Sequence, residues 1–215
     1  MNFFKRVTIL LSCALSFILS SSLTQALETD DFYALGASIP DSRKAINNYV
    51  NNIIDQDVLK VNKKKRIASC DKLTLRIAGK LLTRFRGPVN LLERKGLLYP
   101  DTDGRDEIYK ETIYRDIPVL KSQSRHIRVD QIVFGEDKFE HFFGYGYYYF
   151  NLHYLGKGEV KKALKFGLFM EYFNLGAYKT GVMSYGDLAA NFNGMRFWNH
   201  ILAKRKDILD QNFGP

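Results

Sequence analysis

The 215-residue sequence contains only two cysteines, Cys13 and Cys70, and only five prolines. So few cysteines exclude a disulfide framework and a Cys-rich zinc module. The sequence also lacks a P-loop, a dinucleotide-binding glycine motif, a nucleophile elbow and a His-Glu-x-x-His motif, which excludes the nucleotide-binding and hydrolase classes that these motifs define. Internal repeats and low-complexity stretches are absent, and 46% of the residues are hydrophobic, so the composition is that of a folded domain.

The first 26 residues have the pattern of a secretory signal peptide. Lys5 and Arg6 precede an apolar run from Val7 to Leu19, and Thr24-Gln25-Ala26 supplies small residues where a signal peptidase would cleave. The apolar run of about 13 residues is shorter than the roughly 20 that span a bilayer. We therefore expect cleavage after Ala26 and an exported protein, periplasmic or secreted. Lipid attachment at Cys13 and an uncleaved anchor are the alternatives.

Positive charge exceeds negative charge along the chain. The sequence has 32 Lys and Arg against 23 Asp and Glu, a net charge of +9, and loss of Lys5 and Arg6 with the leader leaves 30 against 23, or +7. This excess favours an anionic partner, which for an exported protein means anionic lipid or peptidoglycan. Nucleic acid is not expected, because the basic residues are not interleaved with an RNA-binding aromatic signature. A membrane surface would meet the basic positions Lys63 to Arg66, Lys121, Arg125, Arg128 and Lys204 to Lys206; a solvated basic surface is the simpler interpretation.

Apolar residues recur mostly at helical spacing, which predicts a mainly α fold. We expect a helical bundle with a central aromatic-rich helix and a less regular connecting layer. Pro40-Asp41-Ser42 begins a helix whose apolar face continues to Ile54, and further helices are predicted at 71–85, 137–155, 160–175 and 184–204. Residues 27–215 would then form one domain, divided into N-terminal helices (27–97), an irregular connection (98–130) and a C-terminal three-helix unit (131–206). Short strands are an alternative for the apolar positions around Ile127 to Val133.

The predicted helix 137–155 is apolar on nearly all faces, which is typical of a helix at the centre of a bundle or in lipid. Its neighbours carry Glu159, Lys161, Lys162, Lys165 and Glu171. Each charge at the centre of a bilayer costs about 2.5–3.5 kcal/mol, so a bundle core is favoured over a membrane span.

Five polar residues on three predicted helices are candidates for a functional site. Asp137 and His141 are four residues apart and share a helix face, as do Asp187 and Asn191. Glu171 lies in mid-helix among apolar residues, where an ionised carboxylate needs a partner. If the three helices pack together, the five side chains meet in one pocket. Asp137, His141, Glu171 and Asp187 would suit a divalent cation, or the same groups would act as an acid–base set.

A purely structural role competes with this interpretation. Asp137 precedes Glu140 by three residues, and Ser184 precedes Asp187 by three, which is the spacing of a capping box at a helix start. Glu171 would then form an ion pair with Lys138 or Arg196.

The polar residues also form a sparse pattern that resembles VanZ-like proteins and related small periplasmic lipoproteins. Asp137-Lys138-Phe139-Glu140-His141-Phe142 is similar to their D-K-x-x-H-F element, and Glu171 stands at their helical acidic position. Ser184, Asp187, Asn191 and Gly194 match their S-x-x-D-x-x-x-[ND]-x-x-G element. The resemblance covers residues 137–194 and implies a link to the bacterial envelope, without an agreed reaction. VanZ-like proteins place these helices in the membrane, whereas this chain is more charged and begins with a cleavable-looking leader.

Three functional hypotheses follow for an exported domain of a Gram-negative-type envelope. In the first, the pocket binds or processes an anionic envelope component. His141 or Glu171 would be the general base, Asp137 and Asp187 would orient it or hold a cation, and Lys138, Asn191 and Ser184 would complete the binding site. The second is a non-enzymatic interaction protein with structural caps and ion pairs. The third is a cell-wall glycan hydrolase with paired carboxylates such as Glu140 and Glu171, which would need a separation of about 5–9.5 Å.

Overall fold

The structure, a computed structural model, describes residues 38–64, 70–83, 92, 94–97, 125–175, 177, 183–202 and 206–209. Within these ranges the fold is mainly α-helical, as predicted, with one two-stranded sheet. The helices and strands are α2 (Arg43–Lys64), α3 (Cys70–Thr83), β1 (His126–Val129), β2 (Ile132–Gly135), α5 (Lys138–Glu140), η4 (His141–Tyr145), α6 (Gly146–Phe150), η5 (Asn151–Leu155), α7 (Val160–Met170), η6 (Glu171–Leu175) and α9 (Tyr185–Leu202).

Several predictions concern residues outside the described part of the chain. The leader with Cys13, residues 98–124, Lys204 and Arg205 belong to this group, as do the side chains of Lys63 to Arg66. The predictions of cleavage, lipid attachment and export therefore stay predictions.

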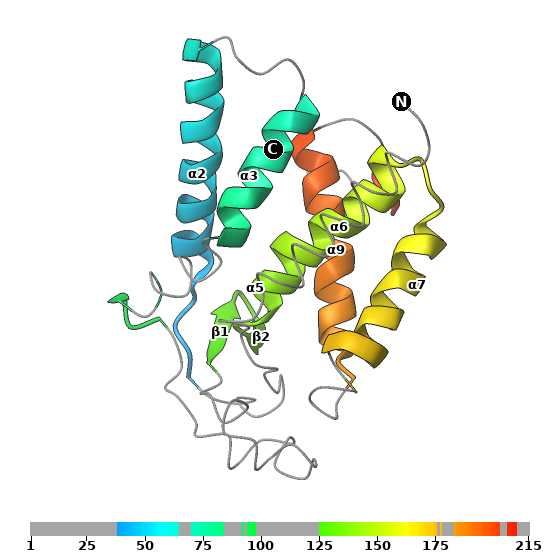
Figure 1. The fold of residues 1–215 in the computed structure, drawn as a ribbon. Helices are drawn as coiled ribbons and strands as arrows, with labels where there is room; N and C mark the ends of the chain where they lie inside the picture. The colour runs from blue at the N-terminus through cyan, green and yellow to red at the C-terminus, as the bar shows by residue number, and fades with distance from the viewer. Residues whose placement is uncertain are drawn as a thin grey trace.

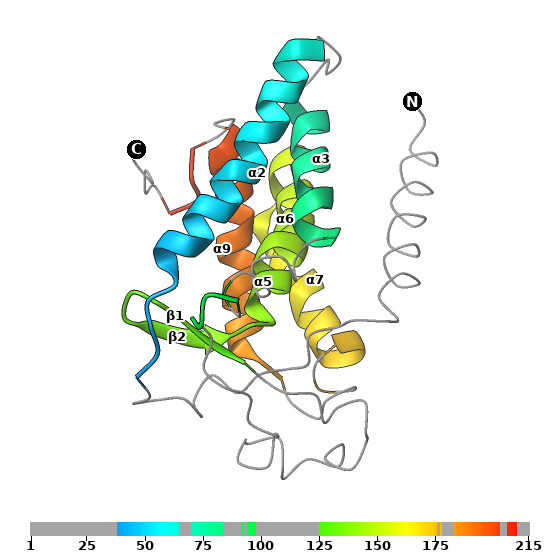
Figure 2. The same ribbon diagram turned by 90° about the vertical axis from the view of Figure 1, so that its left-hand side faces the viewer.

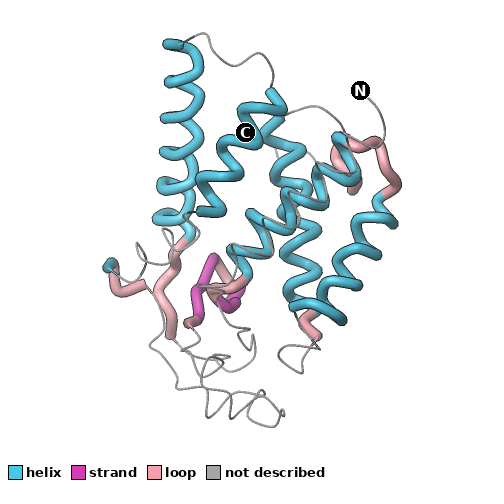
Figure 3. Tube along the Cα trace, in the orientation of Figure 1, coloured by secondary structure: helices cyan, strands magenta, loops and turns pink. Residues whose placement is uncertain are grey.

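The elements α5, η4, α6 and η5 follow one another without a break, and we call them the central helix. It crosses the middle of the fold, with α9 packed against it, α3 and α2 toward one side and α7 toward the other (Figure 1). The view from the side shows α2 and α3 lying next to each other along the bundle (Figure 2). Apart from the small hairpin, the described segments are helices joined by loops (Figure 3).

Three segments of five residues each are π-helical rather than α-helical. Two of them, η4 and η5, belong to the central helix, and the third, η6, continues α7. The sequence patterns did not predict these turns. A π-helical turn inside an α-helix is rare and often lies at a functional site. Two of the three begin at candidate site residues, because η4 starts at His141 and η6 starts at Glu171.

The core is built largely from aromatic side chains between the central helix and α9. Tyr149, Phe150 and Trp198 are fully buried, and the Trp198 indole Nε1–H donates to the carbonyl oxygen of Phe143 at 3.1 Å. Apolar side chains of α2 and α3, including Val50 and Ile77, belong to the same cluster. The N-terminal and C-terminal helices therefore share one hydrophobic core.

Two glycines let the central helix and α9 approach each other closely. The Cα of Gly194 lies against Gly146, and a Cβ on Gly194 would overlap the carbonyl oxygen of Phe142. Gly167 of α7 makes a similar contact, because a Cβ there would overlap the hydroxyl of Tyr149. Close contacts at these glycines set the separation of the helices and therefore the relative positions of the side chains on them.

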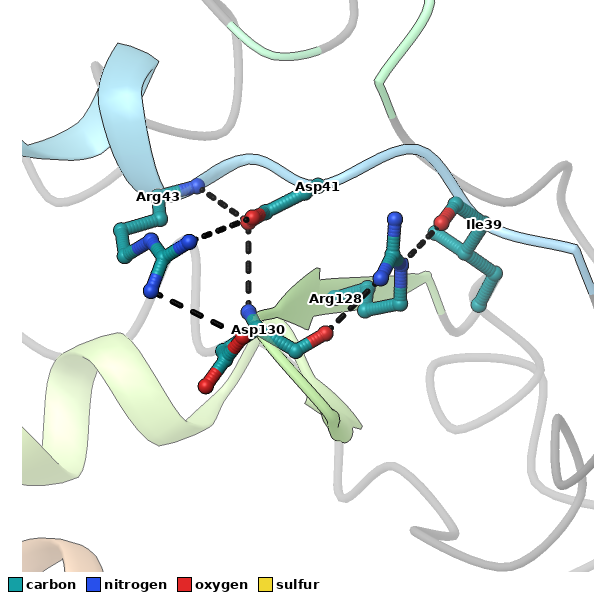
Figure 4. A network of polar contacts seen from close by, with 5 residues as sticks. All are labelled: Ile39, Asp41, Arg43, Arg128 and Asp130. Atoms are coloured by element: carbon teal, nitrogen blue, oxygen red, sulfur yellow. Dashed lines mark hydrogen bonds and ion pairs between the residues drawn. The ribbon is translucent and has the colours of Figure 1, made fainter.

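The hairpin β1–β2 pairs His126 to Gly135 in antiparallel register and confirms the strand alternative for this segment. Asp41 and Arg128 form a parallel bridge, so the segment before α2 adds to β1. Asp41 accepts hydrogen bonds from the backbone N–H groups of Arg43 and Asp130, which hold its pKa below the usual value, and Arg128 donates to carbonyl oxygens of Ile39 and Asp130 (Figure 4). Arg128 is thus engaged within the fold.

None of the described helices combines the length and the apolar character needed to cross a membrane.

We expect Gly194→Ala to destabilise the protein by about 1–3 kcal/mol, because the added methyl group forces the two helices apart. Gly79→Ala in α3 is the matched control. A Cβ at Gly79 has no neighbour within 4 Å, so this substitution should leave stability unchanged or raise it by about 0.5–1 kcal/mol. Urea unfolding followed by circular dichroism measures both, and equal effects of the two substitutions would contradict the proposed close contact.

Candidate functional site

The start of the central helix and the start of α9 bring four of the five candidate side chains into one cluster, in which Lys138 contacts two of them. Its ammonium Nζ lies 2.7 Å from Asp137 Oδ2 and 2.8 Å from Asp187 Oδ1. The contact with Asp187 is an ion pair without the alignment of a hydrogen bond. A single ammonium group therefore compensates two carboxylates from elements 50 residues apart in the chain.

His141 lies on the other side of Asp187. Its Nε2 is 3.1 Å from Asp187 Oδ2, and its Nδ1 is 3.1 Å from the side-chain amide of Asn191. When its amide nitrogen points toward His141, Asn191 donates to Nδ1 of His141 and to the backbone carbonyl oxygens of Asp187 and His141, both at 3.2 Å. The opposite orientation would place the amide oxygen against two carbonyl oxygens. Nδ1 is thus an acceptor, and the ring proton lies on Nε2, directed at Asp187.

These contacts join Asn191, His141, Asp187, Lys138 and Asp137 into one chain of polar groups, which we call the relay. Asp187 is at its centre with one oxygen toward an imidazole and the other toward an ammonium. The predicted convergence of Asp137, His141, Asp187 and Asn191 is therefore present in the structure.

Glu171 reaches the same region from η6 by contacting the start of α9. Its Oε1 accepts a hydrogen bond from the backbone N–H of Ser184 at 2.9 Å, and the Ser184 hydroxyl accepts one from the N–H of Asp187 at 3.2 Å. Ser184 thus caps α9, as predicted. In an ordinary capping box the acidic residue of the same helix would bind the cap N–H. Here Glu171 takes that position from a neighbouring helix, and the carboxylate of Asp187 points toward the relay instead.

One part of the structural interpretation, the capping role of Asp137, is wrong. Asp137 forms no capping hydrogen bond at the start of α5, because its carboxylate binds Lys138. Arg196, one of the two alternative partners expected for Glu171, binds Asp207, with Nε 3.0 Å from Oδ2.

Burial makes the relay electrostatically unusual. The side chain of Asp187 is 1% exposed, that of Lys138 is 7% exposed and that of His141 is 11% exposed. Burial, and next the charges of Asp137 and Glu171, raise the pKa of Asp187 to about 7, although Lys138 acts in the opposite direction. Near neutral pH the site therefore gains or loses a proton at Asp187. Of the two relay residues that contact Asp187, His141 is more exposed to solvent than Lys138.

Among the described residues, no group of three or more His, Cys, Asp and Glu side chains has the arrangement of a metal site. The geometry around Lys138 gives the physical reason. A cation bridging Asp137 and Asp187 would occupy the space that the ammonium group fills.

Two tyrosines on the central helix complete the site and were not among the candidates. The ring of Tyr145 stacks on His141 with centroids 5.1 Å apart, and the side chain of Asn191 influences the pKa of the Tyr149 hydroxyl, which it lowers against the effect of burial. Burial raises the pKa of both tyrosines. The positions 141, 145 and 149 follow a four-residue spacing, so the helical period alone could have placed these tyrosines on the same face as His141.

Glu140, the other carboxylate of the glycan-hydrolase hypothesis, is half-buried. Burial raises its pKa, while His141 acts in the opposite direction. Both Glu140 and Glu171 raise the pKa of Tyr145 through their charges, so both lie in its electrostatic neighbourhood. The hydrolase hypothesis stays a prediction.

No protein-family model, curated protein or solved structure matches this chain. The similarity to VanZ-like proteins therefore stays a resemblance of the motif residues.

The pKa of Asp187 predicts a stability that falls with rising pH. Its carboxyl group keeps a proton up to about pH 7 in the folded state but only to about pH 4 when unfolded. Between these values the folded state binds more protons, so this group lowers the unfolding free energy by up to about 1.4 kcal/mol per pH unit. In Asp187→Asn this contribution disappears, and the variant should gain stability relative to the wild type from pH 4 to pH 7.

Urea unfolding at a series of pH values tests this expectation. Asp55→Asn on the exposed surface of α2 is the matched control and should follow the wild-type pH profile. A constant difference between the wild type and Asp187→Asn over the whole range would show that Asp187 ionises at its ordinary pKa.

Proposed function

We propose that this chain is an exported, envelope-associated protein that processes an anionic envelope component by proton transfer at the Asp187–His141 pair. The observation that supports this most directly is the buried Asp187, whose pKa is about 7 and whose carboxylate faces Nε2 of His141 at 3.1 Å. A strongly perturbed ionisable group with a specific partner is typical of functional sites.

The cost of burying the relay also supports a functional role. Two carboxylates and an ammonium group removed from water lose several kcal/mol of hydration each, which their mutual attraction often fails to recover. Apolar residues of similar size would stabilise the same helix contact at lower cost. The presence of charged groups at this position therefore supports a role for them in binding or proton transfer.

In the proposed reaction, His141 exchanges a proton with a hydroxyl group or water molecule of the ligand complex. Because Nε2 donates to Asp187, the lone pair that accepts this proton is on Nδ1, where the Asn191 amide now donates. A ligand hydroxyl would take the place of that amide. Asp187 then stabilises the imidazolium, and Lys138 fixes the carboxylate in position. Since the ammonium supplies the positive charge, this mechanism uses no divalent cation.

A second candidate is a non-enzymatic envelope protein in which the relay only holds the helices together. The contacts that favour it are those between protein groups: both ring nitrogens of His141 and both oxygens of Asp187 face other residues of the chain.

Incubation of the mature protein with peptidoglycan sacculi and with anionic phospholipid vesicles tests the proposal, with products detected by mass spectrometry. We expect product at pH 7, unaffected by a metal chelator. Asp187→Asn and His141→Gln should each lower the rate by about 10²–10⁴-fold, the usual contribution of general acid–base catalysis. Asp55→Asn, the same change on the surface of α2, should retain the wild-type rate.

The two candidates give different results in this experiment. Full activity of folded Asp187→Asn and His141→Gln would reject the acid–base mechanism. Absence of product from the wild type, together with a loss of stability in both variants at every pH, would favour the structural role.

A further inference from the structure

The side of α7 and η6 that faces away from the core exposes an unusual number of apolar side chains. Five of them are between 38% and 66% exposed: Leu164, Leu168, Phe169, Tyr172 and Phe173. Ala163, Gly167 and Glu171 of the same helix are buried, so they mark its opposite side. We call the exposed side the α7 outer face.

Three exposed lysines accompany these apolar residues on the outer face. Lys161, Lys162 and Lys165 lie in the N-terminal half of α7, whereas Phe169, Tyr172 and Phe173 lie toward the C-terminal end. Glu171 is the only acidic residue between positions 160 and 175, and it is 2% exposed and bound to Ser184. The outer face therefore carries three positive charges and no exposed negative charge.

From this arrangement we propose that the α7 outer face docks on the surface of an anionic phospholipid bilayer. The aromatic end of the face would enter the boundary between headgroups and acyl chains, and the lysines would contact lipid phosphates. The inference deepens the proposed function by naming a bilayer as the envelope component that the protein meets. It rests on the proposed envelope location, but not on proton transfer at Asp187.

The composition of the face favours lipid over a protein partner. Protein interfaces are enriched in arginine and depleted in lysine at their centres, whereas interfacial amphipathic helices combine Lys or Arg with Phe and Leu. The α7 outer face has three lysines and no arginine. The basic positions first expected to meet a membrane include Arg125 and Arg128, and both are engaged within the fold, by Glu136 and by carbonyl oxygens.

The position of Glu171 connects this surface to the site. Glu171 is directly followed by the exposed Tyr172 and Phe173, while its own carboxylate binds the N–H of Ser184 at the start of α9. A bilayer in contact with the outer face would therefore meet the side of the helix opposite to the carboxylate that binds the start of α9.

Co-sedimentation of the mature protein with vesicles tests the proposal. One set of vesicles contains phosphatidylglycerol and phosphatidylcholine, and the other contains phosphatidylcholine alone. We expect binding to the first set, weakened by salt, and little binding to the second. The triple variant K161Q/K162Q/K165Q should bind the anionic vesicles on the order of 100-fold more weakly, since each lysine near an anionic surface contributes about fivefold. F169A/F173A should lose binding as well.

Matched variants separate the effect of the face from that of total charge and exposed apolar area. K44Q/K72Q/K95Q removes three exposed lysines elsewhere, and L75A/I132A removes two exposed apolar side chains elsewhere. Both should bind like the wild type, as should Asp187→Asn, so failure of this proposal is distinguishable from failure of the proton-transfer proposal. Circular dichroism verifies that each variant is folded.

Three results would overturn the proposal. The first is no sedimentation of the wild type with anionic vesicles. The second is an equal loss of binding in K44Q/K72Q/K95Q, which would mean that only net charge matters. The third is a dimer in solution that F169A/F173A dissociates, without vesicle binding, which would assign the face to a second copy of the chain.

Discussion

The direct contact between the backbones of Gly146 and Gly194 determines the geometry of the polar site. Without side chains at these positions, the central helix and α9 approach until the Cα of Gly194 meets Gly146 and the carbonyl of Phe142. His141 lies just over one turn before Gly146, and Asn191 lies three residues before Gly194. A short hydrogen bond between the two helices is therefore within reach of ordinary side chains. The same packing places Trp198 where its indole binds the Phe143 carbonyl.

The position of each charged group in the site depends on the groups next to it. Lys138 lies between Asp137 and Asp187 and takes the place that a metal ion would have between them. Burial, and next the negative charges of Asp137 and Glu171, raise the pKa of Asp187, while the ammonium group of Lys138 opposes them. Because Glu171 supplies the acceptor for the N–H of Ser184, Asp187 does not cap its own helix and its carboxylate remains in contact with His141.

The helix formed by α7 and η6 separates two chemically different environments. One side packs on the core through Ala163 and Gly167 and carries Glu171 toward the start of α9. The other side presents lysines and aromatic residues to the surroundings. The change from α-helical to π-helical geometry begins at Glu171, and the wider turn alters the direction of successive side chains. Glu171 and the α7 outer face therefore lie on opposite sides of one helix.

Helical periodicity and glycine breaks were enough to predict the helices, because they depend on local spacing and on burial of one face. The predicted helix 137–155 corresponds to Lys138–Leu155, and the predicted helix 184–204 to Tyr185–Leu202. Four-residue spacing also identified Asp137, His141, Asp187 and Asn191 as neighbours on their helices. By contrast, the pairing of Lys138 with two carboxylates, the position of Glu171 at the start of another helix and the orientation of Asn191 depend on distances between segments far apart in the sequence.

The sequence by itself determined the secondary structure and the residue types that could carry chemistry, since both follow from short-range pattern and side-chain functional groups. Only the tertiary structure decided which group neutralises which, since electrostatic energy depends on separation and burial. The sequence spacing at Asp137 fits both a capping box and a member of the relay. Only the packing of α9 against the central helix, which places Asp187 and Asp137 on the same ammonium group of Lys138, distinguishes the two.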